Sequence, residues 1–134
     1  MYIFDRFNSY GLGPGQTPQI YDSTPNVKRR HHNIEHFLAQ KPGVKQKTDQ
    51  SYVDNIGNLL PLYFKDNSTL GNDSPEEKIL VLKEELSSGV QCLPFVKDFV
   101  TKYSVEAPHW DKERIERRAK DLASKAYLEV WKIK

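Results

Sequence analysis

Hydrophobic residues in the second half of the chain recur every three or four positions, which is the spacing of one face of an α-helix. The longest series consists of Ile115, Ala119, Leu122, Ala126, Val130 and Ile133. It predicts a helix over about residues 110–133, with this series as a continuous buried face. The basic residues of the segment then fall on its other faces, namely Lys112, Arg114, Arg117, Arg118, Lys120 and Lys125. We expect Trp110 and Trp131 to be packing residues.

Two shorter helices are predicted before this one. The first begins at Ser74-Pro75-Glu76-Glu77, which combines an N-cap serine, a proline at the first helical position and a glutamate at the third. It ends at Ser87-Ser88-Gly89. Its apolar face consists of Ile79, Leu82 and Leu86. The second carries Phe95, Val96 and Phe99 and ends near Tyr103.

The first half of the chain contains shorter apolar runs. Residues 1–10 predict a strand or a short helix with Ile3, Phe4 and Phe7 as its apolar side, and the Gly- and Pro-rich residues 11–25 predict a loop. Residues 33–40 and 55–62 each predict a strand, and the polar residues 41–52 predict the connection between them. The fold class that follows is α+β, mostly helical, with two short strands.

Composition limits the class of protein. With 134 residues, 37% of them hydrophobic and 28% charged, the chain is long enough for one globular domain. The single cysteine, Cys92, excludes an internal disulfide and a Cys-rich zinc site, and we read it as a buried apolar residue. No apolar run approaches the roughly 20 residues of a membrane helix, and no signal peptide is visible. We therefore expect a cytoplasmic protein that does not use the membrane. The net charge of +2 is too small to indicate a nucleic-acid partner by itself.

The first predicted strand carries the pair Glu35-His36. Neighbouring side chains of a strand point to opposite faces, but a bend allows both to reach one ion and its water. A carboxylate suits Mg²⁺ or Mn²⁺, and a neutral imidazole can take a proton from water. Taken alone, the pair is equally consistent with two solvated surface residues.

Two asparagines extend this pattern. Asn58 follows Gly57 in the second predicted strand, and its amide can orient the imidazole of His36 by a hydrogen bond. Asn67 lies where a helix could begin, and its amide oxygen can join Glu35 in holding one Mg²⁺ or Mn²⁺ ion. The alternatives are a turn residue for Asn58 and a helix N-cap for Asn67. Asn72 is a rival of Asn67 as the second ligand.

The order and the flanking residues resemble the HNH endonucleases of the ββα-metal, or His-Me finger, class. More narrowly, they resemble the C-terminal HNH-type nuclease domain of GmrSD-like, modification-dependent restriction proteins. That family has a Glu-His-Ile-x-Pro-Gln segment, then Gly-Asn-Leu-x-Leu, then a helix with Asn and Lys. The corresponding residues here are Glu35-His36-Phe37-Leu38-Ala39-Gln40, then Gly57-Asn58-Leu59-Leu60-Pro61-Leu62, then Asn67, Asn72 and Lys78. Ala39 replaces the proline of the family, which affects backbone stiffness and no catalytic group.

The resemblance implies a divalent-metal-dependent DNA endonuclease in a restriction or anti-phage defence system. Double-stranded DNA, with modified DNA included, would be the substrate. A larger parent chain, or a partner with a nucleotide-dependent sensing domain, would control it. The resemblance favours Asn67 over Asn72 as ligand. Basic residues are then expected to contact the DNA phosphates. They are Lys28, Arg29, Arg30, Lys65, Lys78 and Arg117, although Lys78 could equally be solvated and Arg117 could equally pair with an acid such as Glu113.

The expected organisation is an N-terminal segment and basic arm over residues 1–32, followed by an HNH-like nuclease domain with C-terminal helices over residues 33–134. The expected catalytic residues are His36, Asn58 and Asn67, and Glu35 and Asn67 are the expected ligands of one metal ion. Two alternatives remain open. One is a DNA-binding relative that has lost cleavage. The other is a helical protein-interaction module in which the asparagines only form turns and caps.

Overall fold

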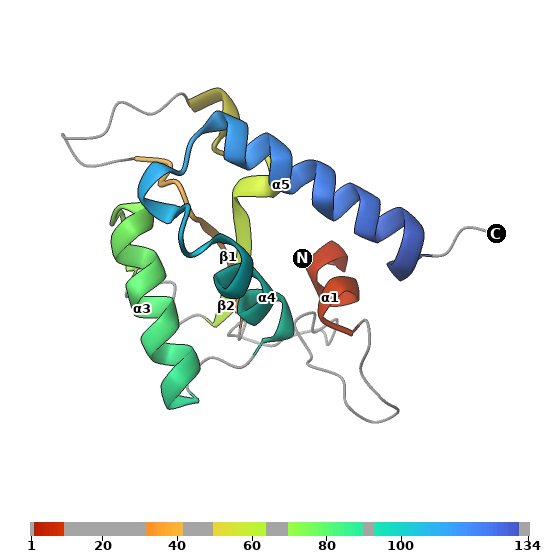
Figure 1. The fold of residues 1–134 in the computed structure, drawn as a ribbon, viewed down its shortest axis with the longest axis horizontal. Helices are drawn as coiled ribbons and strands as arrows, with labels where there is room; N and C mark the ends of the chain where they lie inside the picture. The colour runs from red at the N-terminus through yellow and green to blue at the C-terminus, as the bar shows by residue number, and fades with distance from the viewer. Residues whose placement is uncertain (1, 10–31, 42–49, 64–69, 90–92, 132–134) are drawn as a thin grey trace, which may run out of the picture.

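The computed structural model describes residues 2–9, 32–41, 50–63, 70–89 and 93–131 (Figure 1). These residues form a mostly helical α+β domain, which confirms the predicted fold class. The helices are α1 (Tyr2–Ser9), α3 (Pro75–Ser88), α4 (Pro94–Tyr103) and α5 (Lys112–Lys125), and the strands are β1 (His32–His36) and β2 (Leu59–Tyr63). Short helical turns occupy η1 (Gln50–Tyr52), η2 (Ile56–Asn58), η3 (Ala107–His109) and η4 (Ala126–Val130). Among the described helices, none has the length and apolar character needed to cross a membrane.

The two strands form an antiparallel pair. Glu35 lies opposite Leu60 and His36 lies opposite Leu59. The second strand starts later than predicted, because residues 56–58 form the turn η2. The side chain of Asn55 caps this turn by accepting a hydrogen bond from the Gly57 N–H at 2.8 Å. Asn58 therefore belongs to a turn that leads into β2. The connection predicted over residues 41–52 lies mainly outside the described residues.

The predicted signals of α3 are confirmed. Ser74 and Glu77 form a capping box, since the side chain of each accepts a hydrogen bond from the backbone N–H of the other. The helix ends before Gly89, which has the left-handed φ of 76° that favours glycine. Ile79 and Leu82 are buried, and Leu86 packs against the core at its edge.

The predicted last helix begins at Lys112 rather than Trp110. The side chain of Asp111 caps it by accepting the N–H of Arg114 at 3.1 Å. Ile115 and Leu122 of the predicted apolar series are buried, whereas Ala126 and Val130 are partly buried in the π-helical turn η4. Ile133 lies outside the described residues, as does Cys92.

The core joins the strands to the helices through aromatic residues. The ring of Phe37, just after β1, packs edge-on against Phe99 of α4 at 4.9 Å and against Trp110 at 5.3 Å. Residues 2–9 form a helix, one of the two predicted alternatives, and Phe7 contacts Trp131 at 5.8 Å. Figure 1 shows α1 beside η4, which continues the last helix after α5. Trp110 is a buried packing residue, as predicted, whereas Trp131 packs against Phe7 with 36% of its surface exposed.

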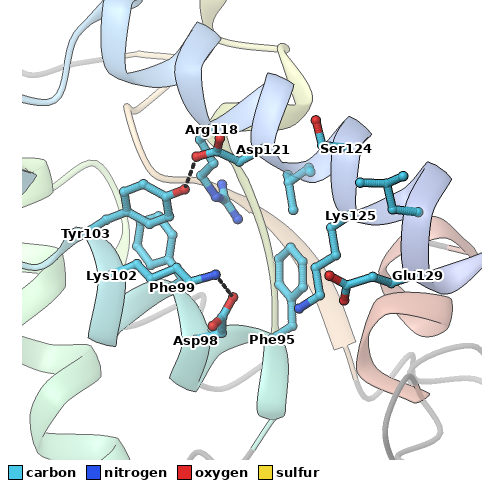
Figure 2. Close-up of a pocket in the computed structure, with 12 residues that line it drawn as sticks. Phe95, Asp98, Phe99, Lys102, Tyr103, Arg118, Asp121, Ser124, Lys125 and Glu129 are labelled. Atoms are coloured by element: carbon cyan, nitrogen blue, oxygen red, sulfur yellow. Dashed lines mark hydrogen bonds and ion pairs between the residues drawn. The ribbon is translucent and has the colours of Figure 1, made fainter.

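Arg118 was expected on an outer face of α5, and this expectation is wrong. Its side chain is buried, and its Nη1 donates to the carbonyl oxygens of Gly57 at 2.8 Å and Leu59 at 3.0 Å. The guanidinium lies 4.5 Å from the centre of the Phe99 ring, as Figure 2 shows between α4 and α5. Burial lowers the pKa of Arg118 to about 9, so the group stays charged at neutral pH. Arg118 therefore ties α5 to both sides of Asn58.

Close packing reinforces this tie. A Cβ atom added to Gly57 would lie 1.9 Å from the carbonyl oxygen of Ile115 in α5. The backbone of η2 therefore touches the backbone of α5, and only glycine leaves room for that approach.

The Asn58 side chain is fully buried and uses its whole hydrogen-bonding capacity. Its Oδ1 accepts from the Leu38 N–H at 2.7 Å and from Trp110 Nε1 at 3.2 Å. Its Nδ2 donates to the carbonyl oxygens of Leu38 at 3.0 Å and Val53 at 2.8 Å. With no capacity left for an imidazole, the predicted hydrogen bond from Asn58 to His36 is wrong. Asn58 instead fixes the backbone that follows His36.

A partly buried polar contact joins α4 to α5. The hydroxyl of Tyr103 donates to Asp121 Oδ2 at 3.1 Å, drawn as a dashed line in Figure 2. Burial, and then this hydrogen bond to a carboxylate, raise the pKa of Tyr103 to about 12. The folded protein therefore holds this proton at pH values where the unfolded chain has lost it.

We predict that Asn58→Ala destabilises the domain by roughly 3 kcal/mol or more, because it leaves several buried backbone groups without partners. The matched control is Asn55→Ala, which removes one capping bond from the same turn and should cost about 1 kcal/mol. Urea unfolding followed by circular dichroism measures both. Equal costs for the two variants would contradict the role assigned to Asn58.

Tyr103 predicts a specific loss of stability at alkaline pH. The pKa of Tyr103 is higher in the folded protein than in the unfolded chain. The stability that its protonated hydroxyl contributes is therefore complete below pH 10 and is lost as the pH rises from 10 to about 12. We expect the free energy of unfolding to fall by about 1–2 kcal/mol more in the wild type than in Tyr103→Phe over this range. Tyr127→Phe, at an exposed position, should behave as the wild type. Parallel pH profiles for wild type and Tyr103→Phe would contradict this prediction.

Candidate functional site

A cavity of about 420 Å³ opens where β1 ends. Three of the residues that surround it, Glu35, His36 and Asn72, are ones the sequence singled out. The complete lining consists of Ile34, Glu35, His36, Ala39, Gln40, Gly71 and Asn72. Both residues belong to β1, which ends at His36, and both line this cavity.

The imidazole of His36 is held from one side. Its Nε2 lies 2.9 Å from Asp54 Oδ1, and Gln40 Nε2 donates to the same oxygen at 3.2 Å. Hydrogen bonds from Gln40 and from His36 hold the pKa of Asp54 below its usual value. The ionised carboxylate of Asp54 accepts a hydrogen bond from Nε2, so the ring N–H that faces Asp54 is assigned to Nε2. The second ring nitrogen, Nδ1, is then free to accept a proton.

Asp54 and Gln40 were not identified as site residues from the sequence. Asp54 lies in a turn 18 positions after His36, and a single exposed aspartate in a turn has an ordinary structural explanation. In the sequence, Gln40 stands out only through the family resemblance. The local signal that could have suggested Asp54 is its place just before Asn55 and Gly57, in the turn that leads into β2.

Glu35 is buried, and its Oε1 forms an ion pair with Nζ of Lys78 from the first turns of α3. Burial raises the pKa of Glu35, and the hydrogen bond and charge of Lys78 partly offset the rise. Lys78 has 0% of its surface exposed and also donates to the carbonyl oxygen of His36 at 2.8 Å. The expectation that Lys78 contacts DNA is therefore wrong, because its ammonium group is enclosed by the protein.

The donor groups at the cavity fit a hard divalent cation. Glu35 supplies a carboxylate, and Asn72 supplies an exposed amide on the same cavity. Asn67, the ligand that the resemblance favours, lies outside the described residues. Within the described ranges, no three His, Cys, Asp or Glu side chains gather in a metal-binding group. Mg²⁺ tolerates such a sparse set because it keeps several waters.

Of the other predicted DNA contacts, the described residues include Arg117. Arg117 pairs with Glu106, rather than with the Glu113 considered from the sequence, and its side chain is half exposed. That hydrogen bond raises the pKa of Arg117, which stays charged. Lys28, Arg29, Arg30 and Lys65 lie outside the described residues.

A second cavity of about 400 Å³ lies between α4 and α5 (Figure 2). It shares no lining residue with the cavity at Glu35 and His36. Two of its acids already have partners, since Asp98 pairs with Lys102 at 3.2 Å and Asp121 accepts from Tyr103. It offers no histidine and no unpartnered pair of acids, so we place the candidate chemistry at the first cavity.

Comparison with known proteins identifies the family of the chain. The model of the family described as "GmrSD restriction endonucleases, C-terminal domain" matches residues 6–125. Searches of curated proteins and of solved structures gave no match. The matched range contains every described residue of the first cavity as well as Asn58, Lys78 and Arg118. The chain belongs to the family of C-terminal domains of GmrSD restriction endonucleases.

Proposed function

We propose that this nuclease module of a restriction system hydrolyses DNA phosphodiester bonds by an HNH-type reaction with one Mg²⁺ or Mn²⁺ ion. The observation that carries the proposal is the common cavity of Glu35 and His36, with His36 held by Asp54. Membership of the family gives the nuclease function and DNA as substrate. The metal dependence and the role of each residue are our inference from the chemistry of these side chains.

In this proposal His36 is the general base. Asp54 holds Nε2, which leaves Nδ1 to take a proton from the attacking water. Asn58 keeps the segment after His36 in place through its bonds to Leu38, and the Phe37 N–H donates to the Asn58 carbonyl oxygen at 2.9 Å. The base is therefore mounted on a rigid turn, which limits the loss of orientation during the reaction.

Glu35 and an asparagine amide would hold the cation. Asn72 is the described candidate for that amide, and Asn67 stays a proposal from the resemblance. When bound, the ion would stabilise the developing charge on the phosphate and the departing 3′ oxygen. The basic residues Lys28, Arg29, Arg30, Lys65 and Arg117 would guide the DNA backbone to the cavity. Modified DNA and a nucleotide-dependent sensing partner are further expectations from the resemblance.

We predict that the protein nicks supercoiled plasmid DNA in Mg²⁺ or Mn²⁺ and not in EDTA. His36→Ala should lower the rate by roughly 10²-fold or more, since it removes the general base. Asp54→Asn should lower it about 10-fold to 100-fold, because it loosens the imidazole. Asn72→Ala, at an exposed position, should fold normally and raise the metal concentration needed for half-maximal rate. Gel electrophoresis of the plasmid, with unmodified and base-modified DNA in parallel, measures all of these.

The matched control is His109→Ala, which removes an exposed histidine of η3 that does not line the cavity. It should leave the nicking rate unchanged. Cleavage that persists in His36→Ala would show that another group is the base. Cleavage that continues in EDTA would contradict the need for a metal ion.

A further inference from the structure

Lys78 occupies a position that electrostatics normally disfavours for a cation. It lies at the N-terminal end of α3, where the helix dipole favours negative charge. Its side chain is fully buried, and burial of an ammonium group is costly unless it is paired. The two contacts that offset this cost are Glu35 Oε1 and the carbonyl oxygen of His36. Both lie on residues of the proposed active site.

These contacts change what Glu35 can offer to a cation. Oε1 is taken by Lys78, so Oε2 is the carboxylate oxygen that remains for an ion at the cavity. The charge of the carboxylate is also balanced by the ammonium group, so the pair carries no net charge. Asn72, the other described donor, is neutral. Affinity for hard divalent cations rises with the number of negatively charged ligands. The described donors of this site carry little net negative charge.

A DNA phosphate would supply the missing charge. It carries the negative charge and the oxygen ligands that Mg²⁺ prefers in phosphate-processing sites. The cation and DNA would then each strengthen the binding of the other, and thermodynamic linkage requires that the two effects be equal.

We propose that Lys78 keeps the cation affinity of the free domain low and makes cation binding depend on a DNA phosphate. Lys78 is in this view a positioning residue that acts through Glu35 and does not touch DNA. The inference rests on the proposed function, since it assumes that Glu35 is a ligand of the ion. It implies an order of binding, in which the cation binds tightly only when DNA is present.

The test measures Mn²⁺ binding by electron paramagnetic resonance, with and without a short DNA duplex. All proteins carry His36→Ala so that the DNA stays intact. In this background we expect DNA to raise the Mn²⁺ affinity about 10-fold or more, and Mn²⁺ to raise the DNA affinity by the same factor. Lys78→Met should bind Mn²⁺ about 10-fold more tightly without DNA, and its gain from DNA should be smaller. Fluorescence anisotropy of labelled DNA gives the reciprocal measurement.

Three further variants complete the test. Lys83→Met removes an exposed lysine of the same helix and should match the His36→Ala background. Glu35→Gln should abolish specific Mn²⁺ binding in both conditions. Lys78→Gln keeps N–H donors on a side chain of similar reach without the charge. It should show the same tighter binding as Lys78→Met, and it replaces that variant if methionine prevents folding.

Two results would overturn the inference alone. Mn²⁺ affinity that is unchanged or weaker in both Lys78 variants without DNA would show that Lys78 does not restrain the ion. A gain from DNA as large as in the background would show that Lys78 does not create the dependence. Absence of Mn²⁺ binding in the His36→Ala background and in the unsubstituted protein, with or without DNA, would instead overturn the proposed metal site together with the inference.

Discussion

The buried amide of Asn58 is the interaction on which the arrangement of this domain depends. Its side chain forms hydrogen bonds with the backbone of Leu38 and of Val53, and it also accepts the indole N–H of Trp110. The segment that carries His36, the turn that carries Asp54 and the segment between η3 and α5 therefore share one polar centre. Because a buried amide left without partners is costly, these three segments have one favourable arrangement relative to one another.

Two buried cationic side chains also bind backbone groups near Asn58. Lys78 enters from α3 and Arg118 from α5, and each donates to backbone carbonyl oxygens beside a residue that the site needs. Buried charges are weak contributors to stability, since desolvation opposes their attraction. The hydrogen bonds of Lys78 and Arg118 to backbone carbonyl oxygens instead fix the positions of β1 and η2. The desolvation of these two cations lowers the stability of the domain, and their hydrogen bonds fix the geometry of one cavity.

The sequence predicted the parts of this structure that local rules govern. The capping box of α3, its glycine end and the apolar spacing in α3 and α4 each depend on residues within a few positions of one another. The pair Glu35-His36 was also visible, because its two residues are adjacent. Asp54, Lys78 and Arg118 act across 18 to 61 positions of sequence, and nothing local distinguishes them from solvated charges. The role of Asn58 was misjudged for the same reason, since its partners were unknown until the chain was folded.

The contact between Gly57 and the carbonyl oxygen of Ile115 has a consequence for the boundaries of the catalytic unit. The strands and the turn that carry Glu35, His36 and Asp54 end before residue 64, yet their shape is completed by a helix that begins at residue 112. A fragment without α5 would lose the guanidinium of Arg118 and leave the carbonyl oxygens of Gly57 and Leu59 without that donor. The strands and the turn therefore cannot be transferred to another protein without α5. Any chimaera or minimal nuclease made from it has to carry α5, with a glycine kept at position 57.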